Sequence, residues 1–197
     1  MPPPVKITKE DIVNVSLDIV RENGFSALNA RNIAKKLSCS TQPIFTNFNS
    51  ISEIKDEVII KAQGIYSDYV DMESKKKIYP LYKSYGMAYI NFARNEKELF
   101  RLIFMEQRDE NKDIYVDYVS KVTPLIKNSL GISEENAKMF HTEMWACVHG
   151  IAVMQVTSFA NIDEKTASMM LTDLYLGLKS RYTGDDRSVE NRTTQFD

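Results

Sequence analysis

Polar side chains that can read the bases of duplex DNA are concentrated between Ser40 and Asn47. Side-chain amides pair with adenine in the major groove, and Thr and Phe contact the methyl group of thymine. The residues that we expect to face DNA here are Ser40, Thr41, Gln42, Pro43, Phe45, Thr46 and Asn47. Their placement on one face of a short helix predicts groove recognition, and a plain solvated surface is the alternative.

Basic side chains flank this segment. Arg31 is expected to contact a guanine or a phosphate, and Lys55 a phosphate, which would position the helix without reading sequence. The total charge is uninformative, with 25 Lys and Arg against 27 Asp and Glu. Residues 1–61 carry 8 basic and 7 acidic side chains, so the first part of the chain is slightly basic and the rest is acidic. This distribution is compatible with a small basic patch.

The elements around these residues form a helix-turn-helix pattern. Asn29 is expected to cap a short helix whose apolar positions follow helical spacing, and residues 38–40 form the turn. Ser40 is then expected to cap the second short helix, with Pro43 in its first turn and its end near Asn47. A capping box that begins at Thr8 predicts a preceding helix over residues 8–23.

Amphipathic segments continue over the rest of the chain. Ser50 is expected to cap a long helix that ends near Met72 and leaves the first three helices. The later helices are expected over residues 80–94, 97–106, 111–130 and 133–159 and after Asp163. The sequence therefore predicts an all-α fold, in which a three-helix head is joined by a long helix to a C-terminal bundle with dimerisation helices. The expected domains are 1–52 (DNA binding), 53–182 (effector binding and dimerisation) and a disordered tail over 183–197.

Residues 8–55 resemble the DNA-binding head of the TetR/AcrR family of bacterial transcriptional regulators. The T-x-R-x-I-A segment of that family is matched by residues 29–34, which follow Gly24 and Phe25. The Y-x-H-F ending of the family's recognition helix is matched by residues 45–48. The resemblance implies a homodimeric, all-helical repressor whose C-terminal domain binds a small molecule and then releases its DNA operator. Carried over by position, the residues that would face the operator are Arg31, Thr41, Gln42, Pro43, Phe45, Thr46 and Asn47.

This sequence departs from the family pattern at three positions. Asn47 stands where the family often has His, and Phe45 stands where it usually has Tyr. Ile51 occupies the position at which a Lys commonly contacts phosphate, and Lys55 lies one turn later and is expected to substitute. We therefore expect weaker or more salt-sensitive operator binding.

A second pattern lies in the C-terminal half, where Trp145, His149 and Gly150 form a W-x-x-x-H-G motif. Trp145 and His149 are four residues apart and share a helix face. The motif resembles one C-terminal subclass of the same family. The residues themselves favour a core Trp, a His that is hydrogen-bonded inside the bundle and a Gly that permits close helix approach. An effector contact by His149 is the alternative, and metal ligation is disfavoured because no second ligand follows at helical spacing.

Large aromatic and Met side chains in this half provide adaptable surface for an effector. The expected pocket residues are Tyr85, Tyr89, Phe92, Phe104, Met105, Met144, Trp145 and His149. Their chemistry predicts an apolar or aromatic ligand, with Glu143 as the nearby charged candidate. The helix after Ser133 and the last helix are apolar on several faces, which predicts a four-helix dimer interface. Its expected residues are Val148, Ile151, Ala152, Gln155, Met170, Leu174 and Leu178.

Other function classes find little support. With 2 His, no Gly-rich phosphate loop and no cysteine cluster, the sequence predicts neither an enzyme nor a metal site or cofactor. Cys39 and Cys147 are expected to be reduced thiols. No segment approaches the roughly 18–20 apolar residues of a membrane span, and we expect a cytoplasmic protein. The remaining alternative is a helical interaction protein whose head binds another protein.

Overall fold

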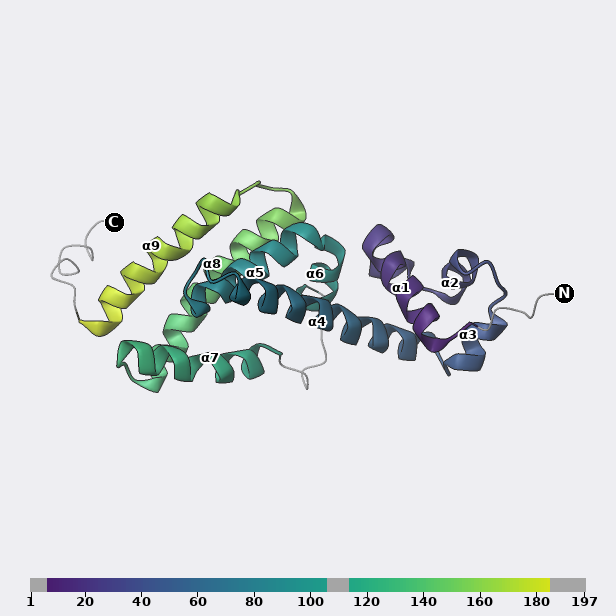
Figure 1. The fold of residues 1–197 in the computed structure, drawn as a ribbon, viewed down its shortest axis with the longest axis horizontal. Helices are drawn as coiled ribbons and strands as arrows, with labels where there is room; N and C mark the ends of the chain where they lie inside the picture. Colours follow the sequence, from purple (N-terminus) through teal and green to yellow (C-terminus); the bar gives the residue numbers. More distant parts are fainter. Residues whose placement is uncertain (1–6, 106–113, 185–197) are drawn as a thin grey trace, which may run out of the picture. The chain divides into compact units, whose positions relative to one another are not determined.

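The computed structural model describes residues 7–105 and 114–184, and the regular structure in these ranges is helical (Figure 1). The all-α prediction is confirmed. The chain divides into two compact units, Met1–Glu106 and Gln107–Asp197. The first unit contains α1 (Lys9–Asn23), a short 3-10 helix η1 (Phe25–Ala27), α2 (Ala30–Lys36), α3 (Gln42–Asn47), α4 (Ile51–Lys75), α5 (Leu81–Asn95) and α6 (Lys97–Phe104). The second contains α7 (Ile114–Leu130), α8 (Glu134–Thr157) and α9 (Glu164–Thr183).

The long helix α4 organises the first unit. Figure 1 shows α1, α2 and α3 gathered about its first turns, and α5 and α6 along its later turns. The predicted boundary at residue 52 falls at the start of α4, which is continuous through this unit.

Side-chain caps define where α1, α2 and α4 begin, as predicted from the sequence. The Thr8 hydroxyl accepts a hydrogen bond from the Asp11 amide at 3.1 Å, and the Asp11 carboxylate accepts one from the Thr8 amide at 2.9 Å. The Thr8 hydroxyl also donates to the Asp11 carboxylate at 2.7 Å, and this bond, together with the one from the Thr8 amide, lowers the pKa of Asp11. Asn29 caps α2 by accepting from the Asn32 amide, and Ser50 caps α4 by accepting from the Glu53 amide.

The turn between α2 and α3 is set by the end of α2. The Ser38 amide donates to the Lys35 carbonyl and the Cys39 amide donates to the Ala34 carbonyl, which is the Schellman pattern. Ser38 has a φ of +53°, in the left-handed region that a side chain disfavours. Two of the orphan carbonyls of α2 are thereby satisfied, and the chain is redirected into α3.

The expected cap of α3 by Ser40 is wrong. The residue that precedes the helix is Thr41, and it makes no side-chain capping bond. A cap at Ser40 would place Pro43 at the third helical position, one of the two positions from which an amide N–H donates to a cap. Proline has no N–H, so this bond is not available. Pro43 lies instead at the second position, still in the first turn.

We expect Ser38→Gly to raise the free energy of unfolding by about 0.5–1 kcal/mol. The left-handed backbone costs a residue with a Cβ roughly 1–2 kcal/mol, which exceeds the added chain entropy of glycine, about 0.4–1 kcal/mol. Urea denaturation measures the change. Ser40→Gly is the matched control, because Ser40 has no positive φ, and it should give no gain. Equal destabilisation by both substitutions would contradict the assignment.

Five rings form the centre of the first unit. They are named here the aromatic cluster and consist of Tyr66, Tyr89, Phe92, Phe100 and Phe104. Their centroids lie 4.7–6.4 Å apart, and many pairs meet edge to face or tilted. The cluster joins α4, α5 and α6 into one core.

An ion pair ties the head to this core. Arg21 on α1 donates to both carboxylate oxygens of Glu96, at 2.9 and 2.7 Å, in the turn between α5 and α6. The hydrogen bond to Glu96 raises the pKa of Arg21. A bidentate pair of this kind fixes orientation as well as distance.

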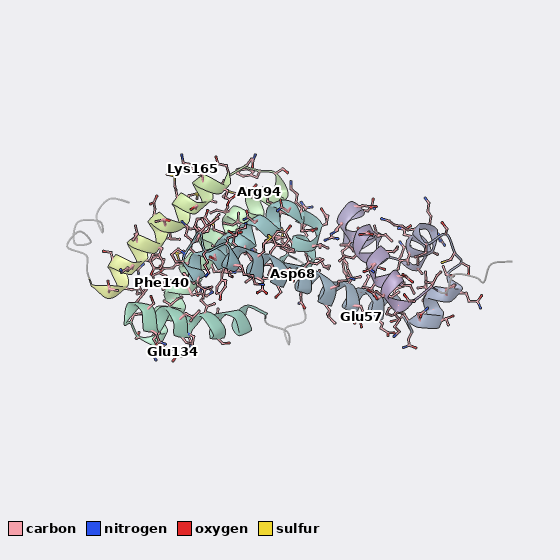
Figure 2. All side chains as sticks on the ribbon, viewed as in Figure 1. Glu57, Asp68, Arg94, Glu134, Phe140 and Lys165 are labelled. Carbon is pink, nitrogen blue, oxygen red and sulfur yellow. The ribbon has the colours of Figure 1, made fainter. Side chains whose placement is uncertain are left out.

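In the second unit, α8 packs against both α7 and α9 (Figure 1). The ring of Phe140, labelled in Figure 2, lies 5.5 Å from that of Tyr175 and 6.0 Å from that of Tyr182. Ser133 and Asp163 cap α8 and α9 as predicted. Thr183, the first residue of the expected disordered tail, is the last residue of α9, and residues 185–197 of that tail lie outside the described residues. None of the helices over 7–105 and 114–184 is long and apolar enough to cross a membrane.

Candidate nucleic-acid interface

Helix α3 is anchored by two apolar side chains and is otherwise open. Ile44 and Phe48 are buried in the head core. Thr41, Gln42 and Thr46 are exposed, and Phe45 is 49% exposed. The side chains of Thr41 and Gln42 have no hydrogen-bond partner among the described residues. Polar groups on a helix that is held from behind are therefore available to a ligand.

The fold uses the side chains of Thr46 and Asn47. The Thr46 hydroxyl donates to the Gln42 carbonyl at 2.9 Å, and Asn47 is bonded through its amide. The side-chain nitrogen donates to the Pro43 carbonyl at 2.8 Å and to the Ile7 carbonyl at 3.2 Å, and the residue is half-buried. These bonds hold the end of α3 against the segment before α1. The side-chain oxygen is the group that remains, and as an acceptor it can bind the amino group of a base.

Two cations beside α3 are free among the described residues. The side chains of Arg31 and Lys35 on α2 are exposed and form no ion pair or hydrogen bond there. Lys36, by contrast, is paired with Glu22 at 2.7 Å. An unpaired, exposed guanidinium in the first turn of α2 has the chemistry to contact a phosphate or a guanine.

The Lys55 side chain is less exposed to solvent than a phosphate contact predicted from the sequence suggests. It is half-buried, and its ammonium lies 5.0 Å from the centre of the Phe25 ring. Such a cation–π contact fixes the side chain at modest energy. Ile51 is also half-buried.

The predicted pocket residues are distributed over both units. Tyr89, Phe92 and Phe104 meet in the aromatic cluster, Tyr85 is half-buried, and Met105 is exposed.

In the second unit, Trp145 and His149 stack with ring centroids 4.8 Å apart and an interplanar angle of 13°. Burial lowers the pKa of His149, which favours its neutral form. Met144 beside them is buried. Among the described residues no group of three or more His, Cys, Asp or Glu side chains is placed to hold a metal ion.

The two thiols are unpaired and half-buried. Burial raises the pKa of Cys147, so its reactive thiolate form is disfavoured.

The predicted interface residues on α8 and α9 are mainly internal. Five are buried within a single chain: Val148, Ile151, Ala152, Gln155 and Leu178. Gln155 donates its amide to the Ile162 carbonyl and so fixes the loop between α8 and α9. Met170 is exposed and Leu174 is half-buried. Exposed apolar surface on α9 lies instead at Met169 and Leu176.

Sequence reasoning missed one buried acidic residue. Glu73 lies on the same face of α4 as Ala62, Tyr66 and Tyr69, and it is buried. A signal for it was present, because a Glu that continues an apolar stripe at three- and four-residue spacing must be buried with that stripe.

No family model matches the chain, and no curated protein matches its sequence. Solved structures do match. A TetR-like transcriptional regulator from Rhodococcus sp. RHA1 aligns with a TM-score of 0.64, at 12% identity, over 89% of this chain and 96% of that chain. A TetR-family member from Streptomyces coelicolor A3 aligns with a TM-score of 0.61, at 14% identity, over 84% of this chain and 96% of that chain. The multidrug binding protein EbrR, solved in complex with imidazole, aligns with a TM-score of 0.58, at 14% identity, over 84% of this chain and 93% of that chain. The chain has the fold of the TetR-like transcriptional regulators.

Proposed function

We propose that this chain is a TetR-family regulator of transcription that inserts α3 into the major groove of duplex DNA. The observation that carries the proposal is the open face of α3, where Thr41, Gln42 and Thr46 are exposed while Ile44 and Phe48 anchor the helix. Gln42 would pair with adenine, and Thr and Phe side chains would contact thymine methyl groups. Arg31 and Lys35 would bind phosphates or a guanine edge and set the register.

The functional form is a homodimer. Met169 and Leu176 are each 55% exposed on α9, with Met170 and Leu174 beside them. Two copies of this apolar strip, with part of α8, would form a four-helix interface. A closed two-fold dimer would place two heads about 34–36 Å apart, or at a multiple of one DNA turn.

In this scheme the protein is a cytoplasmic repressor. Binding of a small molecule releases it from its DNA operator. EbrR, which shares the fold, was solved with imidazole bound, which supports a small-molecule effector here. α4 contacts α1 on one side and α5 and α6 on the other, so a shift of α4 would move the heads out of register. The effector must bind the released arrangement more tightly than the DNA-bound one.

Substitutions in the head test the proposal. On a duplex recovered by selection from a random pool, we expect Arg31→Ala to weaken binding roughly 10-fold and Gln42→Ala to relax base preference at one position, since a specific contact discriminates by about 1–3 kcal/mol. Fluorescence anisotropy at two salt concentrations measures both effects.

The control for these substitutions is Lys165→Ala on α9, which removes an exposed charge far along the chain from α3 (Figure 2). It should leave affinity and preference unchanged. The affinity of the wild-type protein for the duplex should fall steeply as the salt concentration rises. An unchanged base preference in Gln42→Ala would contradict groove insertion, and salt-independent binding would favour a head that binds protein.

A further inference from the structure

Glu73 is a carboxylate that the fold buries without satisfying it. Its side chain is 2% exposed. One oxygen, Oε2, accepts from the Lys76 ammonium at 2.8 Å and from the Asn91 amide at 3.4 Å. The other oxygen, Oε1, is buried and has no hydrogen-bond partner. Buried polar atoms are nearly always paired, so an orphaned carboxylate oxygen offers an acceptor to a water or to the N–H of a ligand.

The surroundings of Glu73 define what that partner must be. Tyr66 and Tyr69 precede Glu73 by seven and four residues and share its face of α4. The Tyr69 ring lies 5.4 Å from that of Phe92, and Phe92 follows Asn91, whose amide reaches the Glu73 carboxylate. Glu73 therefore lies one helical turn beyond Tyr69, whose ring contacts the aromatic cluster through Phe92.

We propose that Glu73 is the recognition group for a ligand with a protonated nitrogen, an amine or an amidine, on an apolar or aromatic body. A cationic N–H would donate to Oε1, a charge-assisted hydrogen bond of the stronger kind. Tyr69 and neighbouring rings would contact the body and attract the cation through their faces. Lys76 supplies the countercharge in the free protein and continues to bind Oε2.

The site deepens the proposed function, since it assigns a chemical class to the effector, and it rests on that function. Glu143, the charged residue expected from the sequence, accepts from Tyr182 at 3.2 Å and Arg181 at 3.4 Å. It also has a buried oxygen without a partner, but its side chain is 29% exposed, against 2% for Glu73. Glu73 is thus the carboxylate with the greater need of a ligand.

Matched pairs of small probes test the assignment. The full chain is titrated with benzamidine and phenethylamine, and with their uncharged counterparts benzamide and 2-phenylethanol, by isothermal calorimetry and ligand-observed NMR. We expect at least one cation to bind 10-fold or more tightly than its counterpart. Glu73→Gln keeps the shape and an acceptor for Lys76, and it should abolish this preference. Asp68→Asn removes an exposed charge from α4 (Figure 2) and should preserve it.

Three results would overturn the proposal: no cation binds, the neutral counterparts bind equally well, or the preference survives in Glu73→Gln. Thermal unfolding of the ligand-free variant gives an independent readout. A residue kept for a ligand is not needed for folding, so Glu73→Gln should unfold at the same or a higher temperature than the wild type. A large drop would make the carboxylate structural and would also overturn the proposal.

The failure of the site and the failure of the proposed function are distinguishable. DNA affinity is measured separately with and without the cation that binds. Cation binding through Glu73 with unchanged DNA affinity would support the site and contradict release by the effector. Cation binding by a protein that shows no DNA preference would support the site and contradict the regulatory function.

Discussion

Phe92→Ala is expected to lower the free energy of unfolding by about 3–5 kcal/mol, the range for removal of a fully buried aromatic side chain. Phe92 has no exposed surface. Its ring contacts Tyr66, Tyr69, Phe100 and Phe104, so truncation would leave a cavity that opens to α4, α5 and α6 together. These neighbours are large and held by one another, so the cavity cannot collapse cheaply. Urea denaturation followed by circular dichroism measures the loss.

Phe159→Ala is the matched control for Phe92→Ala. Phe159 follows α8 and is 84% exposed, so its truncation should change the free energy of unfolding by no more than about 0.5 kcal/mol. A loss below about 1 kcal/mol in Phe92→Ala, or equal losses in the two variants, would mean that the aromatic cluster is not the core of the first unit.

Acid is expected to destabilise the protein through His141. Burial of this side chain, which is 3% exposed, lowers its pKa from 6.5 to about 4. Between these values the unfolded chain binds a proton that the folded chain does not. The contribution of neutral His141 is therefore fully present above pH 6.5 and is lost as the pH falls toward 4. At pH 4 the loss amounts to about 3 kcal/mol.

The measurement for His141 is the free energy of unfolding of the wild type and of His141→Leu at pH 7 and pH 4. Protonation of carboxylates with lowered pKa values, such as Asp11, also destabilises the folded protein in acid. This effect is equal in the wild type and in His141→Leu. The decrease between the two pH values should be about 3 kcal/mol smaller in His141→Leu. His141→Gln, which keeps a polar side chain, should show the same reduction. Equal decreases in wild type and both variants would show that His141 is accessible to protons in the folded state.

Local chemistry explains why much of the fold was predictable from the sequence. Capping by Thr8, Asn29, Ser50, Ser133 and Asp163 depends on a side chain and an amide three residues away, so short-range reading locates these helix starts. Apolar spacing then gives the buried face of each helix. The exception at Ser40 is itself local, since the missing N–H of Pro43 removes one of the two donors that such a cap can use.

The errors and omissions concern long-range geometry. The position of Asn47 predicts a contact with a base. Its side-chain amide nitrogen, however, donates a hydrogen bond to the carbonyl of Ile7, which is distant in sequence. Helical periodicity also cannot say which apolar face of α8 is covered by its own chain. Val148 and Ile151 are buried within one chain, and the exposed apolar side chains of α9 are Met169, Met170 and Leu176. The orphaned oxygen of Glu73 likewise depends on what packs around it, and no spacing rule reveals a missing partner.

Selection from a random duplex pool at low ionic strength tests the central claim most directly. We expect the purified protein to enrich an inverted repeat, with half-site centres about 34–36 Å apart or a multiple of that distance, and to sediment as a dimer. A pool that remains random, recovered with a monomeric protein, would contradict the claim that α3 of two copies reads DNA.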